Sequence, residues 1–411
     1  MDIPLRWPLV IGGAGYTGYY KEGLPENGCA EKWLCDHPQA VQETMEAFRH
    51  AGCTVLAAPT DGADIRQLAP YGLENEMQAI NHKLMTCIGQ MCGTLPAAGC
   101  LGGGLPVSAL ANLDEEETQQ VFSFSERIAQ YRAQAAVLQE AGAALIILRQ
   151  MADLAECRAA FFACRRLHLP VIVCVEAVPE GNTVGGSNLL SVLVSMQAMG
   201  ICGFGVSCPE HMEALPRLVQ ELAPFARVPL IGSIVLGPEE ACGIEDASRL
   251  AHALLEAGAS GIEAGNGLTA AHIHAICESV RRFDFEKRIL PADDSGIVLA
   301  NERQIFRMEH DWIELSEPVS CSLDMADQLL AAEEEGRTDV VTIQIDSADD
   351  AALFAENAHM LNLPVAFLSD QEAALRSALL RYHGRAIIDS RSSIEEDTLR
   401  EIAKKYGAVI Y

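Results

Sequence analysis

Basic side chains are scarce in this sequence. Its 411 residues include 29 Lys and Arg against 57 Asp and Glu, which gives a formal net charge of −28 at pH 7. A chain with this balance is repelled by the phosphates of nucleic acids and by anionic membrane surfaces. We therefore expect neither a nucleic acid nor a membrane among its partners.

Long apolar runs and paired cysteine motifs are missing as well. No segment reaches the roughly 18 apolar residues typical of a membrane-spanning helix, and the opening MDIPLRWPLVIGGAGY has no basic stretch before an apolar core. The 14 Cys form no Cys-x-x-Cys pair, so in a reducing compartment most are expected to be small buried side chains. These absences predict a cytoplasmic protein.

Short apolar runs alternate with amphipathic helical patterns over the first 290 residues. This rhythm is typical of repeated βα units, and eight such strands close into a (β/α)8 TIM barrel. A doubly wound open sheet is the alternative, but GGAGYTG does not have the GxGxxG spacing of a dinucleotide-binding turn. The eight expected strands cover residues 8–13, 54–59, 95–100, 144–149, 170–177, 203–208, 228–235 and 260–265.

A second, shorter series of βα units begins near Pro291. Its expected strands are VVTIQI, PVAFLS, RAIIDS and the final AVIY, which are too few to close an eight-stranded barrel. The fold class is therefore α/β, with a TIM barrel over residues 1–290 and a smaller half-barrel-like α/β domain over 291–411. The strand expected at positions 408–411 would form a sheet edge, and either a homo-oligomer or docking on the first domain would cover it.

Four segments of the first domain resemble the homocysteine S-methyltransferase family. They are PLVIGGAGYTG (8–18), VEAVPEGNTVGGSNL (175–189), GFGVSC (203–208) and GNGLTAAHIHAI (265–276). The second domain is similar in layout to the methyltetrahydrofolate-binding barrel of cobalamin-dependent methionine synthases, although it lacks the later strands. The resemblance implies methyl transfer to a thiol acceptor, a corrinoid or folate methyl donor, and a corrinoid protein as a partner.

The family also binds zinc through three Cys, and here those positions are only partly kept. Cys208 matches the first, while the resemblance places Gly265 and Asn266 at the paired positions that follow. Neither residue can supply a thiolate, so the zinc site is degenerate and Cys208 is either its remnant or a small strand-end side chain. A rebuilt ligand set is conceivable from residues near the same loops, namely Cys202, His211, Cys242, His272, His274 and Cys277.

Arg149 stands where the family has a Glu that holds the substrate's amino group. A guanidinium in the barrel mouth would reject an ammonium and attract a carboxylate or phosphate. The other possibility is an Arg that faces solvent or pairs with Asp153. Polar residues at further strand ends are expected to line the same mouth as substrate-binding groups, and these are Tyr16, Asp61, Glu176, Glu263 and Asn266.

Three functions stay open on this basis, and the sequence does not decide whether the protein is catalytic. The first is methyl transfer to a thiol acceptor, as the resemblance implies. The second is a barrel that binds a different, anionic small molecule without zinc–thiolate catalysis. The third is a non-catalytic partner subunit of a corrinoid methyltransferase system. The carboxylates of Asp61, Glu176 and Glu263 would form either an ion-pair network with Arg149 or a polar pocket.

Overall fold

The computed structural model describes most of the chain. The residues described are 5–13, 15–20, 22–25, 27–103, 124–236, 242–292, 296–308, 312–322, 324–334 and 338–411. Contacts within the chain group it into two compact units, one of residues 1–186 and 201–292 and the other of residues 187–200 and 293–411. In the described parts of the chain, none of the helices has the length and apolar character needed to cross a bilayer.

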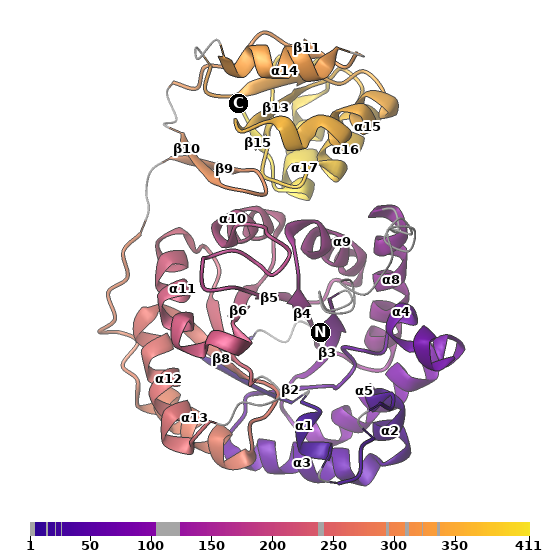
Figure 1. Cartoon of the computed structure of the whole chain (residues 1–411), viewed down its shortest axis with the longest axis vertical. Helices are drawn as coiled ribbons and strands as arrows, with labels where there is room; N and C mark the ends of the chain where they lie inside the picture. The colour runs from indigo at the N-terminus through magenta and orange to yellow at the C-terminus, as the bar shows by residue number, and fades with distance from the viewer. Residues whose placement is uncertain are drawn as a thin grey trace. The chain divides into compact units, whose positions relative to one another are not determined.

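Eight parallel strands form a closed barrel in the first unit, and this confirms the predicted fold class (Figure 1). Each strand pairs with the next one along the chain, and the eighth pairs with the first to complete the ring. The strands fall within a few residues of the expected positions because short β-branched runs favour buried parallel strands. They are β1 (Leu9–Gly13), β2 (Val55–Ala57), β3 (Ala97–Gly102), β4 (Leu145–Met151), β5 (Val171–Glu176), β6 (Gly203–Ser207), β7 (Leu230–Ile234) and β8 (Ala259–Ala264).

Helices connect the barrel strands and surround the sheet (Figure 1). Several end at a glycine in the left-handed region, as at Gly52 with φ 111°, where a side chain would be strained. The helices are α1 (Thr17–Tyr20), α2 (Ala30–Asp36), α3 (Pro38–Ala51), α4 (Ile65–Leu68), α5 (Met77–Cys92), α8 (Phe124–Glu140), α9 (Leu154–Cys164), α11 (Leu215–Leu222), α12 (Ile244–Ala257) and α13 (Ala270–Arg282).

The inside of the barrel changes from apolar to charged along the strands. Ile11, Ile147, Ile172 and Ile231 belong to one fully buried apolar cluster. Successive side chains on a strand point to opposite faces, so Arg149 has the same orientation as Ile147, two residues earlier on β4. The sequence therefore directs a guanidinium into the barrel at the carboxyl end of β4, above the apolar layer.

The second unit is built on a five-stranded parallel sheet in the order of the chain. A two-stranded antiparallel hairpin precedes this sheet, and its apolar residues share a core with the sheet through Leu299, Val340 and Ile387. The strands are β9 (Ile297–Ala300), β10 (Ile305–Met308), β11 (Val319–Ser320), β12 (Val341–Gln344), β13 (Val365–Leu368), β14 (Ile387–Ile388) and β15 (Val409–Ile410). This is the smaller α/β domain that the sequence predicts.

The helices of the second unit are α10 (Leu189–Met199), α14 (Met325–Glu334), α15 (Ala348–Asn357), α16 (Glu372–Arg381) and α17 (Glu396–Tyr406). In the chain, α10 comes between β5 and β6, yet its contacts group it with this unit. The backbone N–H of Asn188, its capping residue, donates to the carbonyl of Glu302 at 2.8 Å. Glu302 lies in the hairpin turn between β9 and β10.

Candidate functional site

A cavity of about 400 Å³ lies at the carboxyl ends of the barrel strands. All six side chains predicted as substrate-binding line it: Tyr16, Asp61, Arg149, Glu176, Glu263 and Asn266. The other lining residues are Gln150, Cys174, Ser207, Pro209, Glu210, Ser233, Val235, Leu236 and Gly265. The structure therefore brings the predicted groups together, and whether they bind a substrate stays a prediction.

Arg149, Glu263 and Asp61 form a buried carboxylate–guanidinium centre in this cavity. The Nε of Arg149 donates to Glu263 Oε1 at 2.7 Å, and its Nη2 lies 2.6 Å from the same oxygen. Its Nη1 donates to Asp61 Oδ2 at 3.5 Å. The second Glu263 oxygen accepts from the Ser233 hydroxyl at 2.5 Å. Two carboxylates thus face one guanidinium, and they supply the counter-ions that Arg149 needs because only 6% of its surface is exposed.

This pairing decides between the two possible orientations of Arg149. Asp153 does not pair with it, because its Oδ1 accepts the backbone N–H of Glu156 at 2.6 Å and caps α9 instead. Of the three carboxylates expected near Arg149, Asp61 and Glu263 pair with it. Glu176 forms no ion pair among the residues that the structure describes.

The end of β4 departs from regular strand geometry next to Arg149. The pairing with β5 shifts between Leu148 and Met151, and Gln150 has a φ of 52°, a left-handed conformation that side chains rarely adopt. The Arg149 carbonyl accepts the N–H of Gly103 at 2.7 Å. A Cβ at Gly103 would lie 2.1 Å from the Gln150 carbonyl oxygen, so this close approach requires glycine. Strain of this kind is concentrated at functional sites.

Glu31 adds a third buried carboxylate beside the centre, and the sequence reasoning missed it. It is 6% exposed in the first turn of α2 and accepts a hydrogen bond from the Tyr16 hydroxyl at 2.8 Å. Burial raises the pKa of Asp61 to about 6; Arg149 opposes this shift, whereas Glu31 and Glu263 add to it. Burial and the same Glu31 also raise the pKa of Tyr16 well above its usual value. Acidic residues are common in the first turn of a helix because they interact favourably with the helix dipole. Nothing in the sequence around Glu31 therefore distinguishes it as a residue of the site.

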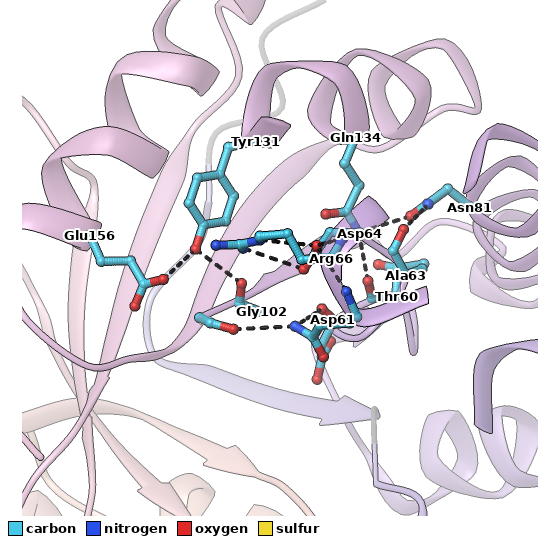
Figure 2. A network of polar contacts seen from close by, with 12 residues as sticks. Thr60, Asp61, Ala63, Asp64, Arg66, Asn81, Gly102, Tyr131, Gln134 and Glu156 are labelled. Atoms are coloured by element: carbon cyan, nitrogen blue, oxygen red, sulfur yellow. Dashed lines mark hydrogen bonds and ion pairs between the residues drawn. The ribbon is translucent and has the colours of Figure 1, made fainter. Parts of the chain in front are cut away.

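The loop after β2, which carries Asp61, is held by buried polar side chains from α5 and α8 (Figure 2). The Gln134 amide donates to the Thr60 carbonyl at 2.7 Å and to Asn81 Oδ1 at 3.1 Å. The Asn81 amide in turn donates to the Ala63 carbonyl at 2.7 Å. These bonds satisfy loop carbonyls that would otherwise be buried without partners, and so they fix the backbone on both sides of Asp61.

Tyr131 extends the same network toward α9 (Figure 2). Its hydroxyl donates to Glu156 at 2.7 Å, and the Arg66 guanidinium lies 5.1 Å from the centre of its ring. Arg66 also pairs with Asp64, which caps α4. Burial raises the pKa of Glu156. Segments far apart in the sequence thus hold the Asp61 loop, and a spacing motif cannot reveal such contacts.

The family metal positions do not fit a zinc–thiolate centre. Cys208 is 2% exposed and is the one Cys at these positions, whereas a zinc–thiolate centre of the family kind needs three. A Cβ at Gly265 would lie 2.7 Å from Val235 Cγ2, so the backbone there leaves little room for a Cys. Cys208 also does not line the cavity, unlike the six other predicted residues.

A rebuilt ligand set is not found either. No cluster of three or more Cys, His, Asp or Glu suited to a metal occurs within the described ranges. His272 uses both ring nitrogens elsewhere: Nδ1 lies 3.2 Å from the Thr269 backbone nitrogen, and Nε2 lies 2.8 Å from the Cys242 carbonyl oxygen. The Cys202 thiol donates to the Val171 carbonyl at 3.1 Å.

The fold and the cavity define a (β/α)8 barrel of the class that places its small-molecule site at the carboxyl ends of the strands. The sequence model described as "Homocysteine S-methyltransferase" matches residues 9–280. The chain therefore belongs to the homocysteine S-methyltransferase family.

Individual relatives are distant. Methionine synthase of Mycobacterium tuberculosis is 23% identical over 410 residues, covering 88% of this chain and 33% of that protein. Methionine synthase of Mycobacterium leprae is 21% identical, covering 62% of this chain and 22% of that protein. This chain thus spans a third or less of either relative. The metallated homocysteine methyltransferase MmuM from Escherichia coli has a TM-score of 0.56 at 20% identity, covering 68% of this chain and 96% of that one, and shows a shared fold.

Proposed function

We propose that this chain binds a small organic molecule in the mouth of its barrel and that it has lost the zinc–thiolate centre of its family. The observation that carries the proposal is the cavity of about 400 Å³, because it joins all six predicted side chains around a buried carboxylate–guanidinium centre. Buried charges are costly and persist mainly where a site uses them or a network balances them.

The anionic ligand expected from Arg149 is not favoured by this geometry. Its guanidinium is already engaged by Glu263 and Asp61. Its Nη2 makes no hydrogen bond among the described residues, yet a carboxylate that bound there would bring a third negative charge to one buried guanidinium. Arg149 is better understood as the balancing charge of the centre than as an anion receptor.

Methyl transfer to a thiol acceptor is the second candidate. It is supported by membership of the homocysteine S-methyltransferase family, with a corrinoid or folate compound as the methyl donor. Because the family metal positions lack the thiolates, zinc could not activate the acceptor thiol there. A reaction in this barrel would need another means of deprotonating it.

A thermal-shift screen of small molecules tests the first proposal. A ligand present at a hundredfold excess over its Kd stabilises the folded state by about 2.7 kcal/mol. The variant Val235→Trp fills the cavity without changing its charge and should abolish the response. Ile289→Trp, at a site that is 94% exposed, is the matched control and should leave the response intact. A response that survives Val235→Trp would contradict binding in the mouth.

Product analysis tests the second candidate. Purified protein is incubated with homocysteine and either methylcobalamin or methyltetrahydrofolate, and methionine is measured. Methionine formation that is lost in Val235→Trp would support catalysis in the mouth. Its absence with both donors would remove this candidate.

Association with a corrinoid protein or with a second copy also stays a prediction. In the described sheet of the second unit, β11 and β15 are the outer strands, and strand edges are places where another chain can pair. Sedimentation of the purified protein, alone and mixed with a corrinoid protein, measures both associations. A single-chain mass in both conditions would contradict them.

A further inference from the structure

The cavity in the barrel mouth holds an excess of negative charge. Five charged side chains line it, and four of them are acidic: Asp61, Glu176, Glu210 and Glu263, against Arg149 alone. Glu31 lies next to the same cavity through its bond with Tyr16 and adds a further buried carboxylate. A low-dielectric cleft lined by one sign of charge concentrates ligands of the opposite sign.

The one guanidinium at the cavity is already paired with two carboxylates. Arg149 lies between Glu263 and Asp61, and its Nη2, 2.6 Å from Glu263 Oε1, makes no hydrogen bond among the described residues. No other Lys, Arg or His lines the cavity in the described part of the chain. An anionic or zwitterionic ligand would therefore place its carboxylate among carboxylates.

One carboxylate oxygen in the cavity has no partner. Asp61 is 8% exposed, and while its Oδ2 accepts from Arg149, its Oδ1 has no hydrogen bond among the described residues. An unsatisfied buried acceptor is costly, and a charged N–H donor is the partner that compensates it best. The buried Cys100 thiol interacts with the Asp61 carboxyl, but a thiol is a weak donor. This oxygen therefore still lacks a strong N–H donor.

Glu176 supplies a second unneutralised carboxylate, at the end of β5. It is half-buried, lines the cavity and forms no ion pair within the described ranges. Burial and the neighbouring Glu210 raise its pKa, as expected for a carboxylate without a counter-ion. A cation in the cavity would relieve this repulsion as well.

We infer that the barrel mouth takes an organic ammonium ligand that carries no carboxylate, with an N–H donor on Asp61 Oδ1 and with Glu176 and Glu210 balancing its charge. This inference deepens the proposed ligand-binding function and depends on it. It differs from an amino-acid substrate in one respect that can be tested, because the ligand's acidic group is absent.

A matched pair of probes tests the charge requirement. Cyclohexylamine and cyclohexanecarboxylate have similar size and opposite charge, and their affinities are measured by isothermal titration calorimetry at neutral pH and low salt. The amine should bind at least about tenfold more tightly, since hydrogen bonds to charged groups are worth that ratio or more. Asp61→Asn should weaken amine binding by about tenfold, and the rim variant Glu176→Gln should weaken it less.

Controls separate this inference from the ligand-binding proposal beneath it. Circular dichroism shows whether Asp61→Asn is folded. If that variant is unfolded, the weaker amine binding expected for Glu176→Gln still tests the inference. Glu372→Gln, an exposed site on α16, should leave affinity unchanged. Equal or tighter binding of the carboxylate overturns the inference but leaves ligand binding in the mouth intact. If the amine does not bind, the inference also fails, and only a silent thermal-shift screen would overturn the proposed function as well.

Discussion

Two sets of residues at the barrel mouth differ in how they are built. In the first set, Arg149, Asp61 and Glu263 form a buried centre, and side chains from α5 and α8 hold the Asp61 loop. In the second set, the family metal positions hold a buried Cys, a Gly and an Asn. The chain thus has the (β/α)8 fold of its family, while the buried charges of the mouth lie at the ends of β2, β4 and β8.

The largest expected effect comes from removing the guanidinium. Arg149→Met leaves Glu263 and Asp61 as buried carboxylates without their counter-ion, so we expect a loss of about 3–5 kcal/mol in the free energy of unfolding. Urea denaturation followed by circular dichroism measures it. The double variant Arg149→Met with Glu263→Gln should recover part of the loss. A loss below about 1 kcal/mol, the value typical of an exposed ion pair, would contradict the assignment of Arg149 to a buried charged centre.

Acid titration gives the next effect. Because burial raises the pKa of Asp61 to about 6 in the folded protein, the folded state keeps a proton that the unfolded chain releases near 3.8. Stability therefore falls as pH rises through this window, by on the order of 3 kcal/mol. The charged groups that face Asp61 also affect its pKa: Arg149 lowers it, whereas Glu31 and Glu263 raise it.

Asp61→Asn isolates this contribution. The variant should lose the decline between about pH 4 and 6 that the unmodified protein shows, in chemical denaturation repeated across that range. Asp284→Asn, an exposed control on the barrel unit, should keep the decline. Identical slopes in Asp61→Asn and the unmodified protein would mean that Asp61 ionises in the mouth as it does in water.

Part of this structure follows from the sequence and part does not. The strands are predictable because apolar runs and turn residues determine the local backbone conformation. Alternate residues of a strand face the same side, so Arg149 points into the barrel like the buried Leu145 and Ile147. The resemblance also identifies Gly265 and Asn266 as replacements. The pairing of Arg149 with Glu263, 114 residues away, and the burial of Glu31 arise only when the barrel closes.

A smaller effect is expected in the network behind the Asp61 loop. Tyr131→Phe removes the hydroxyl that donates to Glu156 and leaves that carboxylate with one fewer donor. We expect a loss of about 1–3 kcal/mol in unfolding free energy, because a buried acceptor is left unsatisfied. Thermal and urea denaturation measure it. Tyr71→Phe, on an exposed tyrosine, serves as the control, and an equal effect of the two variants would argue against the network.

The smallest effect is expected at Cys208, the first of the family metal positions. Cys208→Ser replaces a buried protonated thiol with a hydroxyl of similar shape, so stability should change by about 1 kcal/mol. Ligand affinity in the thermal-shift screen should stay the same, because Cys208 does not line the cavity. A loss of binding in this variant would show that Cys208 acts together with the residues that line the cavity.

Zinc content tests the central claim most directly. The protein is purified without chelators, equilibrated with zinc and analysed by elemental mass spectrometry, together with Cys208→Ser. The account predicts substoichiometric zinc in both proteins, because the family metal positions supply a single Cys, while Gly265 and Asn266 supply no thiolate. Stoichiometric zinc that disappears in Cys208→Ser would contradict it and would restore the zinc–thiolate reaction of the family to this barrel.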